Sequence, residues 1–335
     1  MVKVKQDKDF YIIGIENDNI KVELLNYGAS IKSIKTKDYL GNFEDIVLEY
    51  KNLDDYLENN IHLNATIGPI AGRVKDGLIK MSDEIYQLDK NFNEKHTLHG
   101  GTLALSHKFF DFEITENKDF TEVLFYYETD EPFNYLLRVI YQINDNKIRI
   151  DYEIETDKEF IFNLTNHAYF NLSGNLKADV LNHQIFLASN LRHELDEDSL
   201  FTGKIIKEKT IYDFTELDYA KKAINPLSKT SKGGLDDIYY FPNNDLRKLM
   251  AVITDPISKR VLKIRSTMDH LVLYSHNNIN QLPLVHLNDH KKHYALCFEC
   301  EKAPYGFNDK DARSLLVKPG KISKNTIIFE FLTQK

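Results

Sequence analysis

The chain has 335 residues, of which 42% are hydrophobic, and its formal net charge at pH 7 is −8. Nucleic acids and anionic membrane surfaces are also negatively charged, so an acidic chain has no general attraction to either. We therefore expect a small-molecule partner, with no nucleic acid and no membrane. Residues 1–7 lack the apolar core of a signal peptide, and no apolar run approaches the roughly 20 residues of a membrane span. This pattern predicts a cytoplasmic protein and leaves the oligomeric state open.

Strand-like segments follow one another along most of the chain. Alternating or apolar β-type patterns occupy residues 30–35, 123–127, 137–143, 147–154, 261–265, 271–274 and 327–331. The turn Asn144-Asp145-Asn146 joins two of these segments as a hairpin. Helical periodicity is scarce, and residues 52–57 form the one short helix that we predict. Close strand spacing without a Pro/Gly-rich linker predicts an all-β fold, a large antiparallel sandwich or barrel, with residues 1–335 as a single domain.

Two segments in the first third of the chain contain candidate ligand-binding side chains. In residues 64–74, Arg73 stands among small residues that let a ligand approach its guanidinium fork closely. A surface arginine at a turn is the alternative interpretation. In residues 97–101, His99 precedes two glycines at a predicted strand-to-loop transition, where the backbone has the freedom to place an imidazole.

Two later segments contain candidate acid–base groups. His167 lies among amide, hydroxyl and aromatic side chains in residues 163–172, although a structural histidine at a strand edge has the same local appearance. Glu299 lies inside the apolar residues 295–301, where a charge is costly unless it is paired, and this makes it a candidate base.

Cysteines and lysines supply further motifs, for which we favour structural interpretations. Cys297 and Cys300 form a C-x-x-C that is typical of a redox pair or half a metal site. An offset of three on a strand directs the two side chains to opposite faces, so we expect buried, reduced thiols. The turn Lys229-Thr230-Ser231-Lys232 is predicted to be a solvated loop.

Taken together, the four segments resemble the aldose 1-epimerase (galactose mutarotase) family from about Leu25 to the C-terminus. The motifs that carry the resemblance are Leu98-His99-Gly100-Gly101, Thr165-Asn-His-Ala-Tyr-Phe-Asn-Leu172, Gly234-Leu235-Asp236, Phe298-Glu299, Pro304 and Asn308. The chain departs from the family pattern at Pro69 and Gly72, which precede Arg73, and at Tyr305 and Gly306. The resemblance implies a galactose mutarotase-like supersandwich with few short helices.

The resemblance also implies a reaction and a set of roles. A hexose such as galactose or glucose would be opened and reclosed at its anomeric carbon, with Glu299 as the base at O1 and His167 as the acid at O5. A carboxylate and an imidazolium favour each other's charged form, so each group is expected to start in its working state. Arg73 and His99 would donate to sugar oxygens, Asp236 would accept from hydroxyls, and Tyr169 would line the site. No metal or other cofactor is implied, and one of Asp236 and Asp237 is expected to be an ordinary turn acid.

Four other functions remain open at the level of sequence. A non-catalytic carbohydrate-binding sandwich also places polar and aromatic side chains on strands. An epimerase acting on a disaccharide such as maltose would use the same acid and base, and one acting on a hexose 6-phosphate would need a cationic cradle as well. The histidine-rich residues 286–293 permit a zinc-dependent hydrolase, although their lysines favour a solvated turn.

Overall fold

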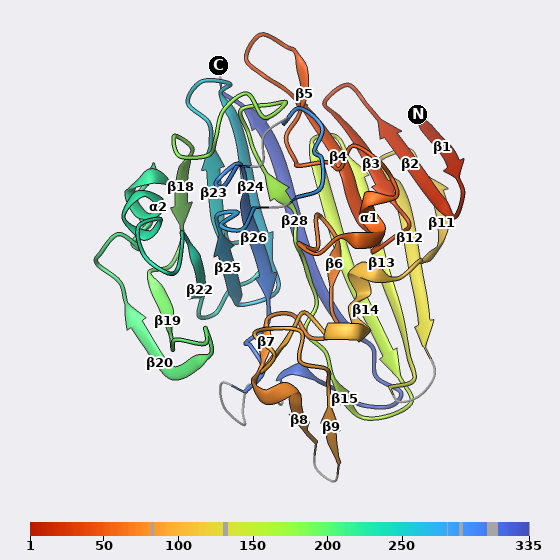
Figure 1. The fold of residues 1–335 in the computed structure, drawn as a ribbon. Helices are drawn as coiled ribbons and strands as arrows, with labels where there is room; N and C mark the ends of the chain where they lie inside the picture. Colours follow the sequence, from red (N-terminus) through yellow and green to blue (C-terminus); the bar gives the residue numbers. More distant parts are fainter. Residues whose placement is uncertain (82–83, 130–132, 280, 288–290, 307–313, 335) are drawn as a thin grey trace.

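The computed structural model describes residues 1–81, 84–129, 133–279, 281–287, 291–306 and 314–334, and antiparallel strands dominate it (Figure 1). In this part of the chain, one sheet contains five strands in chain order: β1 (Val2–Asp7), β2 (Phe10–Glu16), β3 (Ile20–Leu25), β4 (Ser30–Lys37) and β5 (Phe43–Asp45). The longest sheet there has nine strands, in the spatial order β11 (Asp111–Glu116), β12 (Thr121–Thr129), β13 (Tyr135–Asn144), β14 (Lys147–Thr156), β28 (Ser323–Thr333), β24 (Arg260–Ser266), β23 (Ala251–Thr254), β18 (Gln184–Leu187) and β21 (Asp218–Tyr219).

The third large sheet of the described residues has six strands and carries the candidate site. Its spatial order is β17 (Tyr169–Phe170), β26 (Leu296–Glu301), β25 (His270–Tyr274), β22 (Asp236–Tyr240), β19 (Leu191–Leu195) and β20 (Phe201–Lys207). Short antiparallel pairs complete the described strands: β6 (Thr66–Ile67) with β16 (Thr165–Asn166), β7 (Arg73–Val74) with β10 (Thr97–Leu98), β8 (Leu78–Lys80) with β9 (Ile85–Gln87), and β15 (Phe160–Ile161) with β27 (Leu316–Val317). The helical elements are α1 (Asp55–Glu58), α2 (Lys221–Leu227) and the 3₁₀ turns η1 (Lys75–Gly77), η2 (Gly101–Leu103) and η3 (Leu105–His107).

The all-β prediction is confirmed, and every predicted strand lies within an observed one. The hairpin is present as β13 and β14, which pair from Asn144 opposite Lys147 onward. The predicted helix at residues 52–57 is present but shorter, as α1. α2 is absent from the sequence prediction because its seven residues include Pro226, a poor helix former, and the helix is stabilised instead by burial of Ala223, Ile224 and Leu227. The single-domain assignment stays a prediction.

The two smaller sheets lie side by side and share one core with the long sheet. Val47, just after β5, forms a bridge with Phe170 of β17, and this contact links the edges of the five- and six-stranded sheets. Inward side chains of the three sheets, among them Ile31, Phe125 and Phe298, belong to one hydrophobic cluster. The inner faces of the six-stranded sheet are therefore used for packing, and its outer face is free to carry polar side chains.

Arg260 ties the sheets together from within the core, and its loss should be costly. Its side chain is 1% exposed and donates to Glu44 Oε2 (3.0 Å) and to backbone carbonyls that include Thr36 O (3.2 Å) and Leu172 O (3.3 Å). Replacing it with methionine leaves these acceptors buried without a donor, so we expect Arg260→Met to lower the free energy of unfolding by about 3–5 kcal/mol.

Chemical denaturation monitored by circular dichroism would measure this loss. The matched control is Arg265→Met, because Arg265 also pairs with a carboxylate, Glu330 at 2.8 Å, but its side chain is 24% exposed. A partly exposed pair contributes about 1 kcal/mol or less, so the two variants should differ clearly. Equal losses in the two variants would contradict the structural role given to Arg260.

Candidate active site

Successive side chains of β26 point alternately into the hydrophobic core and toward the candidate site. Leu296, Phe298 and Cys300 point inward and belong to the shared hydrophobic cluster. Cys297 and Glu299 therefore point to the outer face, because successive side chains of a strand alternate between the two faces. The two cysteines are free and buried, as predicted, and they pack in two different hydrophobic clusters.

The outer face of the six-stranded sheet forms the floor of a pocket. All six predicted site residues line it, although they come from widely separated parts of the chain: Arg73, His99, His167, Tyr169, Asp236 and Glu299. Ile61 and Phe92 from loops, and Phe201 from the start of β20, add apolar side chains to the pocket wall. A partly apolar pocket with a few convergent polar groups is typical of a small-molecule site.

The backbone around His167 is fixed by a buried asparagine. Asn64 has no exposed surface, accepts from the backbone N–H of Tyr169 (2.9 Å) and donates to Leu48 O (2.6 Å). The His167 carbonyl in turn accepts from the Asn64 N–H at 3.1 Å. His167 also stacks on the Tyr169 ring, with centroids 4.8 Å apart and planes 16° apart. The imidazole is thus held between two short strands, β16 and β17, rather than within one continuous strand.

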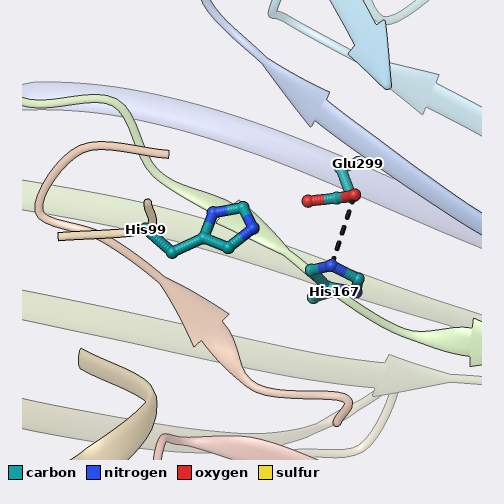
Figure 2. Close-up of side chains that lie close together, drawn as sticks. All are labelled: His99, His167 and Glu299. Atoms are coloured by element: carbon teal, nitrogen blue, oxygen red, sulfur yellow. Dashed lines mark ion pairs between the residues drawn. The ribbon is translucent and has the colours of Figure 1, made fainter. Parts of the chain in front are cut away.

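His167 and Glu299 form the central pair of the pocket. Nε2 of His167 lies 3.4 Å from Oε1 of Glu299, and both side chains are nearly buried (Figure 2). Burial lowers the pKa of His167 to about 4 and raises the pKa of Glu299 well above its ordinary value. The two groups therefore share one proton, which burial places on Glu299. This differs from the imidazolium–carboxylate pair expected from sequence, because desolvation outweighs the mutual attraction of the charges.

His99 is held with a defined tautomer. Its Nδ1 accepts from the Gly72 backbone N–H at 3.2 Å, so Nε2 carries the proton and is the donor toward the pocket. Its ring lies 5.6 Å from that of His167, at 83° (Figure 2). Burial lowers the pKa of His99 well below its usual value, so it is a neutral donor. Gly72 has φ +76°, and a Cβ built there meets nothing within 4 Å, so this departure from the family pattern leaves open space beside Arg73.

Arg73 and Asp236 form an ion pair in the same pocket. Nη2 of Arg73 donates to Oδ2 of Asp236 at 2.9 Å, and the guanidinium lies over the Phe92 ring at 4.7 Å. Burial alone would raise the pKa of Asp236, but the Arg73 guanidinium outweighs it and lowers that pKa overall. Asp236 is therefore an ionised acceptor.

Neither aspartate of the Asp236-Asp237 pair is a turn acid, so that expectation is wrong. Both lie on β22, and Asp237 points to the other face, fully buried, where it pairs with Arg192 (3.1 Å) and Lys232 (2.6 Å). Lys232 is therefore not simply solvated, as predicted for its turn, but is partly buried in this ion-pair group.

Comparisons with known proteins place the chain in a family. The family model for aldose 1-epimerase matches residues 11–330. The chain belongs to the aldose 1-epimerase family. It is 27% identical over 335 residues to aldose 1-epimerase from Streptococcus thermophilus, covering 95% of this chain and 93% of that one. It is 25% identical over 321 residues to galactose mutarotase from Rattus norvegicus, with 95% and 92% covered. The solved structure of galactose 1-epimerase from Lactobacillus acidophilus NCFM has a TM-score of 0.85 at 25% identity and covers 100% of this chain and 99% of that one.

Membership of the aldose 1-epimerase family makes this protein an isomerase and confirms the resemblance seen in its motifs, while the roles of individual site residues stay predictions. Of those motifs, Asn308 lies outside the described residues. Tyr305 is not among the pocket-lining residues, and its hydroxyl accepts from the Lys80 N–H at 2.7 Å. In the described segments, no helix is long and apolar enough to cross a membrane.

Several polar residues of this epimerase pocket are absent from the sequence prediction, among them His62 and Glu301. His62 lines the pocket, binds Ser106 Oγ through Nδ1 at 2.7 Å, and packs edge-on against His99 at 5.0 Å. Glu301 lines the pocket from the end of β26. A signal for Glu301 existed in the sequence, because it lies two residues after Glu299 on a strand and so shares its face. No comparable pattern surrounds His62.

The part of the chain that the structure describes contains one group of three donors compact enough for a metal ion, namely His99, His167 and Glu299, whose atoms lie within 4.8 Å of one another. We assign no metal ligand here, because these groups already match the acid, base and donor that anomerisation needs. The zinc alternative rested on residues 286–293, of which 288–290, including His290, lie outside the described residues. Within the described part, His293 Nδ1 is bonded to Ser275 O at 2.9 Å.

Proposed function

We propose that this epimerase interconverts the α and β anomers of a neutral aldose, with Glu299 as base and His167 as acid. The observation that carries the proposal is the 3.4 Å approach of His167 Nε2 to Glu299 Oε1, two buried groups that line the same pocket. Opening an aldose ring needs one group to accept a proton and another to donate one, which this pair supplies.

The reaction can be written with these two groups alone. The shared proton first moves to His167, a change favoured by the nearby Asp236 carboxylate, which raises the pKa of His167 against the effect of burial. Glu299 then removes the proton of the C1 hydroxyl, the C1–O5 bond breaks as the C1–O1 double bond forms, and His167 protonates O5. After rotation about C1–C2, the O5 hydroxyl attacks the other face of C1, its proton returns to His167, and Glu299 returns its proton to O1.

The remaining residues orient the sugar. His99 presents a neutral Nε2–H donor, and the ionised Asp236 accepts from hydroxyls that Arg73 also reaches. Tyr169 supports the His167 ring and is anchored through its own hydroxyl to Ile61 O at 2.9 Å. Each group thus has a fixed partner, which keeps the site organised before the sugar binds.

The charges of the pocket favour an uncharged sugar over a hexose 6-phosphate. Arg73 is the one Lys or Arg among the pocket-lining residues of the described chain, and Asp236 already pairs with it at 2.9 Å. A phosphate would meet this occupied guanidinium and the ionised carboxylate of Asp236, where a like charge is repelled. We therefore name galactose and glucose as the first substrates to test.

Polarimetry of freshly dissolved α-D-galactose and α-D-glucose tests the proposed function. The expected result is relaxation faster than the spontaneous rate to the same final rotation, since a catalyst leaves the equilibrium unchanged. Maltose and glucose 6-phosphate run in parallel would show whether a larger or a phosphorylated sugar is preferred. Calorimetric binding of the sugars without faster relaxation would overturn the proposal in favour of a non-catalytic carbohydrate-binding protein.

The rate should be lost at both ends of the pH range. Burial lowers the pKa of His167 to about 4, so below that pH the pair holds two protons and no base remains. Burial raises the pKa of Glu299 well above its ordinary value, so an alkaline limb follows when the pair loses its one proton and no acid remains. We expect kcat, corrected for the spontaneous rate at each pH, to stay level between these limbs. An acid limb near the ordinary histidine pKa would contradict this assignment.

Arg73→Lys should weaken substrate binding more than turnover. A lysine ammonium is a point charge that cannot hold Asp236 and a sugar hydroxyl through one rigid fork, so a charged hydrogen bond is lost. Such a bond contributes about 1.5–3 kcal/mol, and we expect KM to rise by roughly 10- to 100-fold. Steady-state kinetics coupled to an anomer-specific dehydrogenase would measure it. The control is Arg247→Lys. Arg247 pairs with Asp245 at 3.0 Å, but its side chain is 91% exposed. An unchanged KM in Arg73→Lys would remove Arg73 from the binding site.

A further inference from the structure

Glu301 has no part in the reaction described above, yet it occupies the same pocket. It ends β26 two residues after Glu299, and its side chain is directed to the same outer face. The residue is 1% exposed, and neither Oε1 nor Oε2 has a hydrogen-bond partner among the described residues. Buried polar atoms are nearly always satisfied, because leaving one unpaired costs free energy. Two such atoms in a ligand pocket indicate that a ligand completes their bonding.

A second unpaired group lies in the same pocket. Nε of Arg73 is buried and also lacks a hydrogen-bond partner in the described chain, although Nη2 of the same side chain is used by Asp236. The pocket therefore holds an unmet donor as well as unmet acceptors. A molecule that carries several hydroxyl groups can satisfy both at once, because each hydroxyl donates and accepts.

The residues around Glu301 do not explain why its carboxyl is buried without a hydrogen-bond partner. The titratable groups that face it are Arg73 on β7, Glu299 on β26, His270 on β25 and Asp236 on β22. His270 is its register partner, but the His270 Nδ1 is bonded to Asp269 at 2.8 Å, and the ring stacks against both His193 and Tyr240. No ion pair of Glu301 is found within the described residues, so a structural salt bridge does not explain its burial.

The protonation of Glu301 suits a hydroxyl rather than an anion. Burial raises the pKa of Glu301 to about 8, with Arg73 opposing the shift, so the carboxyl is mostly protonated at neutral pH. A protonated carboxyl offers one donor and one acceptor. These are the two functions that a sugar hydroxyl needs from a single partner.

We propose that Glu301 is a further sugar-binding residue, which holds a ring hydroxyl of the aldose as a neutral carboxylic acid. The proposal rests on the proposed function in that it takes the substrate to be an aldose, and it extends the site by one residue along β26.

Kinetics of D-galactose anomerisation by Glu301→Ala and Glu301→Gln test the proposal, with Glu113→Gln as the matched control because Glu113 is exposed on β11. Alanine removes the contact, so KM should rise about tenfold with kcat changed by less than about threefold. Glutamine is neutral and both donates and accepts, so at pH 7 it should restore KM to within about threefold of wild type. The control should match wild type throughout.

The pH dependence separates binding from a structural role. Wild-type KM should rise as the pH passes the Glu301 pKa of about 8, whereas the KM of Glu301→Gln should not. This comparison uses the isosteric variant and so decides the matter even if Glu301→Ala does not fold. An unchanged KM in a folded Glu301→Ala, or the same pH dependence of KM in wild type and Glu301→Gln, would overturn the proposal.

If the proposed function is wrong, the wild-type protein itself will not accelerate anomerisation, and this result is distinct from the outcomes above. In that case the same variants are compared by calorimetric binding of D-galactose. A dissociation constant that rises about tenfold in Glu301→Ala and recovers in Glu301→Gln would still support the sugar contact. Unchanged binding in both variants would refute it.

Discussion

Glu299→Gln should fold normally and lose about 10²–10⁴ of kcat, equivalent to about 2.7–5.4 kcal/mol of transition-state stabilisation. The amide keeps the size of the carboxyl and its place on β26, but it cannot accept the proton of the C1 hydroxyl. Only groups that act at the reacting atoms should produce a loss of this size with little change in KM. Polarimetry and a coupled dehydrogenase assay on α-D-galactose would measure kcat for both proteins.

The stability of Glu299→Gln gives an independent check. Burial raises the folded-state pKa of Glu299 above its unfolded value, so the stabilising contribution of its proton is fully present below the unfolded pKa and is lost as pH rises through the folded pKa. Glutamine does not titrate, so the variant does not lose stability in this way. Its free energy of unfolding should rise relative to that of wild type as pH increases. The exposed control Glu113→Gln should change neither rate nor this pH trend. A fully active Glu299→Gln would exclude Glu299 as the base.

The strands were predictable because this fold relies on local patterns. The alternation in residues 137–143 and 147–154 appears directly as the paired strands β13 and β14, which have one buried and one partly exposed face. α2 was not predictable in this way, because it is short, contains Pro226, and is held by packing against the sheets rather than by its own propensity. Tertiary contacts of this kind leave no period in the sequence.

The site residues were predictable as separate motifs, and the resemblance to one family joined them. Arg73 and Asp236 are 163 positions apart, yet they form one hydrogen bond, and nothing local to either residue indicates the other. The location of the shared proton was mispredicted for a related reason. It depends on how completely His167 and Glu299 are buried, which is a property of the assembled sheets and loops.

The position of Glu301 in the pocket follows from a local rule, the alternation of side chains along a strand. Its spacing from Glu299 places both side chains on one face of β26, and the apolar Cys297 on that face shows that the face turns from core to pocket along the strand. The sequence does not show which side chains surround the Glu301 carboxyl. That both carboxyl oxygens remain unpaired is visible only once the surrounding side chains are placed.

His167→Asn should also lose about 10²–10⁴ of kcat, because an amide cannot protonate O5 when the C1–O5 bond breaks. The two losses should not add. Glu299 and His167 share one proton and act as a unit, so the double variant should be about as slow as the slower single variant. Purified single and double variants assayed together on α-D-galactose would measure this coupling.

His183→Asn is the matched control for burial. His183 is buried like His167, and burial lowers its pKa to about 4 as well, but its Nε2 accepts from the Leu172 N–H at 2.8 Å and it is not a pocket-lining residue. Its replacement should therefore lower stability and leave kcat per folded molecule unchanged. If kcat in the double variant of Glu299 and His167 falls by the product of the two single losses, the two groups act independently. The shared-proton mechanism would then be wrong.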